Sequence, residues 1–72
     1  MTGNEFLRRL KRLGRERGVV VYYDAAHGKG SHGALYCGTR RTTLKDLRAE
    51  LGRGLLRRML ADLGLVSSDL NE

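Results

Sequence analysis

A single cysteine, Cys37, stands in a chain of 72 residues, so no internal disulfide can hold the fold together. Two histidines and one cysteine are also too few for the usual four-ligand zinc site, and we expect neither a metal nor a cofactor. A chain this short buries only about 60% of the surface that its unfolded form exposes, which makes its core marginal. We therefore expect one domain over residues 1–66, folded by packing alone, and a polar, frayed tail over 67–72.

The apolar segments of the sequence are short. None reaches the roughly 20 residues that are needed to cross a bilayer. The first apolar residues are interrupted by a run of cations, which is unlike a signal peptide. We therefore expect a soluble, cytoplasmic protein with no membrane partner.

Positive charge dominates the composition. The chain has fourteen Lys and Arg residues and eight Asp and Glu residues, which gives a net charge of +6, and most of the cations are arginine. A basic surface attracts phosphate, and arginine forms forked contacts with phosphate oxygens. The charge therefore favours a nucleic-acid partner, the other explanation being that the arginines keep a small protein soluble.

The N-terminal segment has the pattern of an amphipathic helix. Thr2 and Glu5 have capping-box spacing, in which the threonine side chain accepts a hydrogen bond from an early helix N–H. Four apolar residues then fall on one face: Phe6, Leu7, Leu10 and Leu13. Either Gly14 or Gly18 can end this helix, and Gly18 is favoured because Arg15–Arg17 can add one more turn.

Three strands are expected after this helix. Segments rich in β-branched and aromatic residues predict strands over 19–23, 31–37 and 40–44. A glycine-bearing loop over 26–30 and a tight turn at Gly38-Thr39 join them. The charged connection that follows, residues 45–50, has room for a helical turn of its own.

A second amphipathic helix closes the pattern, with an apolar stripe formed by Leu55, Leu56, Met59, Leu60 and Leu63. Gly64 is expected to cap it, and Leu65 to fold back onto its last turn. The apolar stripes of both helices must be buried against another element, and one face of the sheet can bury them. The predicted fold class is therefore α+β: an α-β-β-β-α order, as in the double-stranded-RNA-binding domain, with two helices packed on one face of a three-stranded antiparallel sheet.

Candidate chemistry lies in the glycine-rich stretch 28–33. Lys29 and Ser31 can hold phosphate oxygens, and His32 can move a proton near neutral pH. The same stretch also fits an ordinary turn followed by a surface histidine. It is not a nucleotide-binding P-loop, because the G-x-x-x-x-G-K-[ST] order is absent.

Two segments of the chain resemble the HicA toxins. Gly30-Ser31-His32, between two predicted strands, resembles the G-S-H signature of that family. Residues 51–65 resemble its C-terminal pattern of a glycine, a leucine, an arginine, an aliphatic-leucine pair and a closing Gly-Leu. The resemblance covers about residues 4–65. This chain departs from many members in having Gly33 directly after the histidine and no proline before the last helix.

The resemblance implies a toxin of a type II toxin-antitoxin system, with a fold similar to the double-stranded-RNA-binding domain. The implied activity is metal-independent endonucleolytic cleavage of messenger RNA, which arrests translation. The implied partner is a HicB-type antitoxin that covers the catalytic histidine. Carried over residue by residue, His32 is the catalytic general acid or base, and Gly30 and Ser31 match the rest of the motif.

We also expect three cations to bind RNA, in addition to Gly30 and Ser31, and this expectation rests on physical grounds. Lys29 lies where it can stabilise a crowded phosphate. Arg40 and Arg41 follow the second strand, and since neighbours on a strand point to opposite faces, only one of them can face the site. The mechanism that we expect is attack by a ribose 2′-hydroxyl on its own phosphate.

Other functions remain open at this stage. A non-catalytic RNA-binding module would use the same fold and the same arginines, with His32 as a contact residue. A DNA-binding regulator fits less well, because three predicted strands separate the two helices and no helix-turn-helix pair is seen. Tyr22 and Tyr23 must point in opposite directions, so at least one of them is expected to leave the core.

Overall fold

The computed structural model describes residues 1–25 and 33–70 of the 72-residue chain. Its elements follow the predicted order and confirm the α+β fold class. In chain order they are α1 (Gly3–Arg17), β1 (Val21–Asp24), β2 (Gly33–Cys37), β3 (Arg40–Leu44), α2 (Arg53–Asp62) and a final 3₁₀-helix, η1 (Ser67–Leu70).

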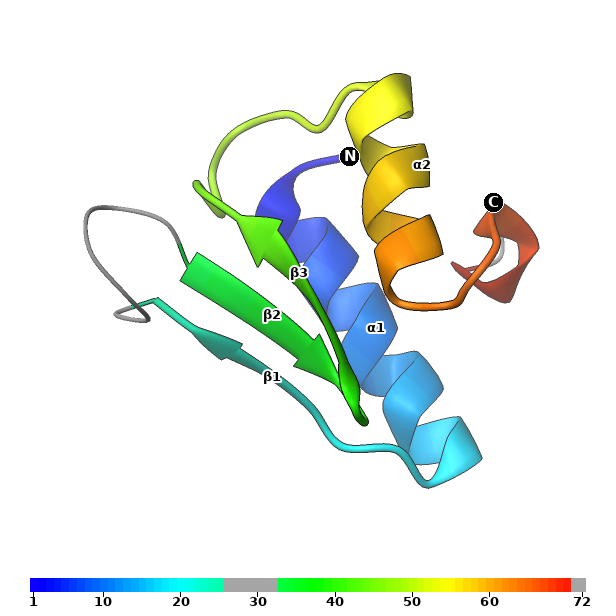
Figure 1. Ribbon diagram of the computed structural model, residues 1–72. Coiled ribbons are helices and arrows are strands. Elements are labelled where there is room, and N and C mark those ends of the chain that lie inside the picture. The colour runs from blue at the N-terminus through cyan, green and yellow to red at the C-terminus, as the bar shows by residue number, and fades with distance from the viewer. Residues whose placement is uncertain (26–32, 71–72) are drawn as a thin grey trace.

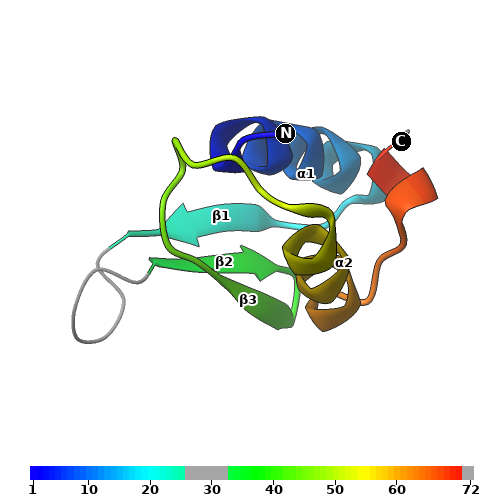
Figure 2. The ribbon, with the colours of Figure 1, turned by 90° about the horizontal axis from the view of Figure 1, so that it is seen from above.

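Both α-helices lie on the same side of the sheet, which gives two layers (Figure 1). Seen from above, α1 lies next to β1 and α2 next to β3 (Figure 2). Leu35, on the central strand β2, is 0% exposed between them. The helices and the inward sheet face supply most of the core cluster, which consists of Phe6, Leu10, Leu13, Leu35, Leu44, Leu51, Met59, Leu60, Leu63 and Leu70.

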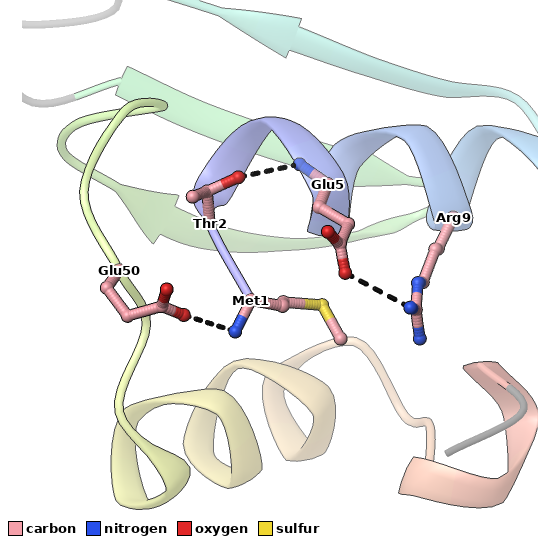
Figure 3. Close-up of polar contacts among 5 residues, drawn as sticks. All are labelled: Met1, Thr2, Glu5, Arg9 and Glu50. Atoms are coloured by element: carbon pink, nitrogen blue, oxygen red, sulfur yellow. Dashed lines mark hydrogen bonds and ion pairs between the residues drawn. The ribbon is translucent and has the colours of Figure 1, made fainter.

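Helix α1 begins and ends where the capping residues predict. The backbone N–H of Glu5 donates to Thr2 Oγ1 over 3.2 Å, and Glu5 in turn pairs with Arg9 one turn later (Figure 3). At the other end Gly18 adopts the left-handed conformation, with φ of 70°, and its N–H donates to the carbonyl of Gly14. Gly18 rather than Gly14 therefore ends the helix, since a residue without Cβ adopts this conformation at low cost.

The three strands form an antiparallel sheet in the order β1-β2-β3. Tyr22 lies opposite Tyr36, and Tyr36 lies opposite Arg41, so these residues form one row across the sheet. β1 begins at Val21, two residues later than predicted. The N–H of Val19 donates to the carbonyl of Gly14 at the end of α1 and so is not available to the sheet. β3 has the predicted bounds, and β2 is described from Gly33 onward.

The connection between β3 and α2, where the sequence left room for a helical turn over 45–50, forms no helix. Instead Ala49 donates to the carbonyl of Asp46 in a single turn, and the chain then runs back along the start of α1. Gly3 N–H donates to Ala49 O and Asn4 N–H to Leu47 O. The amino group of Met1 also pairs with the Glu50 carboxylate (Figure 3). The connection therefore caps α1 with its own backbone carbonyls.

Helix α2 buries only part of its expected stripe. Met59, Leu60 and Leu63 enter the core, whereas Leu55 remains 48% exposed near its first turn. Its end follows the prediction: Gly64 has a φ of 72°, and the N–H of Leu65 donates back to the carbonyl of Leu60. These bonds satisfy the carbonyls that the end of a helix leaves unpaired.

The last described residues are packed rather than frayed. Ser67–Leu70 forms η1, and Leu70 is 3% exposed in the core cluster. Asp69 accepts from the Arg17 guanidinium over 2.6 Å and from the backbone N–H of Val66. The expectation of a frayed tail is therefore wrong for these four residues, which bury Leu70 and bind Arg17 through Asp69.

Candidate nucleic-acid interface

Residues 28–32 of the glycine-rich stretch lie outside the described residues. This holds for Lys29, Gly30, Ser31 and His32. The described residue that follows the motif is Gly33, the first residue of β2. The geometry around Gly33 therefore shows which side chains share this end of the sheet.

Gly33 is buried beneath the ring of Tyr23. A Cβ at this position would overlap the phenol, with Tyr23 Cε1 only 2.6 Å away. The Tyr23 hydroxyl donates to the carbonyl of Leu44 over 2.8 Å, which holds the ring across β2. Aromatic cover of this kind compensates for the missing side chain of a strand glycine. Position 33 therefore requires glycine, and Tyr23 belongs to the inward face.

The two arginines of β3 point to opposite faces of the sheet. Arg40 lies on the helix side, where its Nε is 2.9 Å from the place that a Cβ on Gly64 would occupy. Arg41 lies on the other side, in register with Tyr36. The structure thus divides the pair: Arg41 is the one on the open face, and Arg40 packs over the end of α2.

The open face carries a row of aromatic and cationic residues. The rings of Tyr22 and Tyr36 stack with centroids 4.7 Å apart and an interplanar angle of 14°. Arg41 follows Tyr36 in the same row, on the next strand. Tyr22, at the edge of the sheet, is 49% exposed. Exposed aromatic rings beside an arginine are a common platform for nucleobases and the phosphates between them.

Arg41 does not share the end of the sheet at which Gly33 lies. Gly33 pairs with Leu44, whereas Arg41 pairs with Tyr36, three residues further along β2. At the rise of a strand these positions are about 10 Å apart. The cation that follows Leu44 is Lys45, an exposed residue that was not among the predicted RNA-binding residues. The register of β3 is the signal that identifies it, and the sequence alone does not give that register.

A second basic surface was also missed. Arg8, Lys11 and Arg15 line one side of an open groove of about 600 Å³ between α1 and the start of β1. The other lining residues are Asn4, Leu7, Val19, Val20 and Val21. The signal was present in the sequence, since residues three and four apart lie on one face of a helix.

Cys37 lies on the helix side of β2, partly buried. Burial raises the pKa of its thiol above the ordinary value, and the nearby Arg17 charge offsets this only in part. A raised pKa leaves less thiolate at neutral pH, and the thiolate is the reactive form. Cys37 is therefore poorly suited to act as a nucleophile.

Over residues 1–25 and 33–70, no group of three or more His, Cys, Asp or Glu side chains could hold a metal ion. Among the same residues, no helix is both long and apolar enough to pass through a bilayer. Comparison of the chain with protein-family models, with curated proteins and with solved structures gives no match.

Proposed function

We propose that the chain is a HicA-type messenger-RNA endoribonuclease, the toxin of a type II toxin-antitoxin pair, with His32 as general acid or base. The observation that carries the proposal is the α1-β1-β2-β3-α2 order, which is the fold that the resemblance implies. The G-S-H motif directly precedes Gly33, the first residue of the central strand. The net charge of +6 supports a polyanionic substrate.

The reaction is an internal transfer at phosphorus. The 2′-oxygen of the ribose bonds to the adjacent phosphorus, and the bond from phosphorus to the 5′-oxygen breaks. The 2′-hydroxyl loses a proton, the departing 5′-oxygen gains one, and a 2′,3′-cyclic phosphate remains. His32 serves one of these two proton transfers, for which an imidazole has a suitable pKa near neutral pH.

Lys45 is our preferred electrostatic helper among the described residues. It follows Leu44, which pairs with Gly33, the neighbour of His32 in sequence. A cation here stabilises the charge that develops on the phosphate during the reaction. Lys29 and Ser31 remain candidates for the same role. Arg41, about 10 Å further along the strand, contributes to RNA binding instead.

The RNA path that we propose continues from this end of the sheet to the stacked tyrosines. A base stacks on the exposed side of Tyr22, and Arg41 pairs with a phosphate oxygen. Stacking of this kind accepts any base, so it supplies affinity without a sequence preference.

The central experiment compares His32→Ala with His27→Ala on a single-stranded RNA. Loss of the general acid or base at position 32 should slow cleavage by about 10²- to 10⁴-fold, while His27→Ala cuts at the normal rate.

Cleavage should persist in chelator and should stop on a substrate with a 2′-deoxyribose at the cut site. Lys45→Ala should slow cleavage on the order of 10²-fold. Undiminished cutting by the His32→Ala protein would overturn the catalytic assignment.

The proposed partner is a HicB-like antitoxin that covers His32, and the proposed location is the cytoplasm. Co-expression with the product of the adjacent open reading frame should give a complex in which RNA cleavage is suppressed. Equal cleavage by the free and the co-expressed protein would argue against this partner.

A non-catalytic RNA-binding module is the second candidate, and the row of Tyr22, Tyr36 and Arg41 favours it. This row provides binding without any reacting group. The two candidates differ in one measurement. If the purified protein binds single-stranded RNA and leaves its length unchanged over hours, the binding module replaces the nuclease.

A further inference from the structure

The groove beside α1 combines three properties that no feature of the RNA proposal uses. Its rim is cationic, its floor is aliphatic, and one of its walls is the edge of the sheet. Arg8, Lys11 and Arg15 form the rim along the exposed side of α1. Leu7, Val19 and Val21 form the floor, and Val20, which lies on the same side of the sheet as Tyr22, borders the groove and is 71% exposed.

β1 is an edge strand with unused backbone groups. One side of β1 pairs with β2. The bond from Gly38 N–H to Val20 O shows which backbone groups of β1 point toward β2. In an antiparallel ladder the inward and outward groups alternate, so the N–H and C=O of Val21 and Tyr23 face away from β2. Among the described residues no other backbone group bonds to them. An open row of this kind is a template for a further strand.

The lining of the groove distinguishes a peptide from RNA. An added strand would place alternate side chains toward α1, where Arg8, Lys11 and Arg15 meet acidic groups. The residues between them would face Val20 and Tyr22 on the open side, which suits aliphatic groups. The groove has no aromatic ring among its lining residues on which a base could stack. The rim cations can bind a phosphate or a carboxylate, but the aliphatic floor favours a ligand with apolar side chains.

We propose that this groove binds an extended segment of a partner protein, in which acidic and aliphatic residues alternate, as a fourth strand on the edge of β1. Main-chain hydrogen bonds to Val21 and Tyr23 supply part of the affinity. The charges of Arg8, Lys11 and Arg15 select acidic sequences and speed association. The proposal is independent of the nuclease chemistry and stands if the protein cuts no RNA.

The test uses the full chain and a panel of three ten-residue peptides in which Glu alternates with Val, Ile or Leu. Binding is followed by the backbone amide shifts of the protein. At least one peptide should shift the amides of Val21 and Tyr23 and leave Thr43, on the opposite edge, unchanged. Lys11→Glu should weaken binding by about tenfold, since it reverses a charge on the rim. The control Arg12→Glu makes the same change on the same helix outside the groove and should bind normally.

N-methylation of the bound peptide tests strand addition directly. One peptide is methylated on two of its Glu residues and a second on two of its hydrophobic residues. Only one of these sets presents its N–H groups to β1, so one peptide should lose binding and the other keep it. Equal binding of both peptides would overturn the proposal. So would failure of the whole panel, or groove shifts caused by decauridylate RNA and not by the peptides.

Discussion

The Tyr23 ring fills the space in which a side chain at Gly33 would lie. The two residues come from neighbouring strands and lie on the same face, with Gly33 two positions from Leu35, the direct partner of Tyr23. The glycine that follows the histidine of the G-S-H motif is thus a packing requirement.

Gly33→Ala should destabilise the fold by about 1–3 kcal/mol, the usual cost of forcing an extra methyl group into a packed site. The free energy of unfolding in urea measures it. Gly54→Ala is the matched control, because a Cβ at Gly54 meets nothing within 4 Å and alanine favours a helix. The control should be unchanged or slightly more stable. If both variants have wild-type stability, Tyr23 does not occupy the site.

Arg40→Ala and Arg41→Ala should affect different properties, because the two side chains lie on opposite faces of the sheet. Arg41→Ala should make single-stranded RNA binding less dependent on salt, by a log–log slope of roughly 0.7 for one lost phosphate contact. Arg40→Ala should keep the slope and lower the stability, since its stem packs over Gly64. Affinity titrations at several salt concentrations separate the two. The opposite assignment would place the RNA on the helix side.

The stacked tyrosines should stabilise the sheet together. A double-mutant cycle of Tyr22→Leu and Tyr36→Leu should give a coupling free energy of about 0.5–1.5 kcal/mol, as expected for an aromatic pair beyond its buried area. Unfolding in urea gives the four stabilities. A coupling near zero would show that the rings do not stack in solution.

Asp69 should make stability depend on pH in the acid range. The N–H of Val66 and then the Arg17 guanidinium lower the pKa of this carboxyl. A lowered folded-state pKa means that the carboxylate stabilises the fold above about pH 4 and that this contribution is lost as the pH falls through the folded value. Asp69→Asn should therefore be less stable than the parent at pH 7, and the difference should shrink below pH 4. A difference that stays constant with pH would contradict the assignment.

Cys37 should react slowly with iodoacetamide at pH 8, compared with glutathione, because burial raises the pKa of its thiol. The rate should rise at higher pH and should become normal in urea, where the thiol is exposed. Arg17→Gln should slow the reaction further, since it removes the charge that partly lowers the pKa. Mass spectrometry of timed samples gives the rates. A reaction as fast as that of glutathione would contradict the burial of this thiol.

The order of elements could be predicted because each is specified locally. Thr2 and Gly18 cap α1 through bonds to residues within the same turn, and Gly64 does the same for α2. The features that were wrong depend on distant partners. The connection over residues 45–50 forms no helix, and its Leu47 and Ala49 carbonyls cap α1 instead. Leu70 is buried by elements far away in the sequence.

In the candidate site too, local features could be predicted and features that depend on distant partners could not. Alternation along a strand predicted that Arg40 and Arg41 would separate, but not which one would be inward. That choice depends on the register of β3 against β2, which places Thr42 and Leu44 on the inward face. The same register brings Lys45 next to the residue that pairs with Gly33. No local pattern around Lys45 carries this information.

The backbone caps on α1 have a consequence for folding during synthesis. The amides of Gly3 and Asn4 bond to Ala49 and Leu47, residues that leave the ribosome after the whole sheet. At ordinary rates of translation this delay is on the order of seconds. The first two amides of α1 therefore lack these partners until the connection after β3 has been made, and during that delay the apolar face of the helix is available to chaperones.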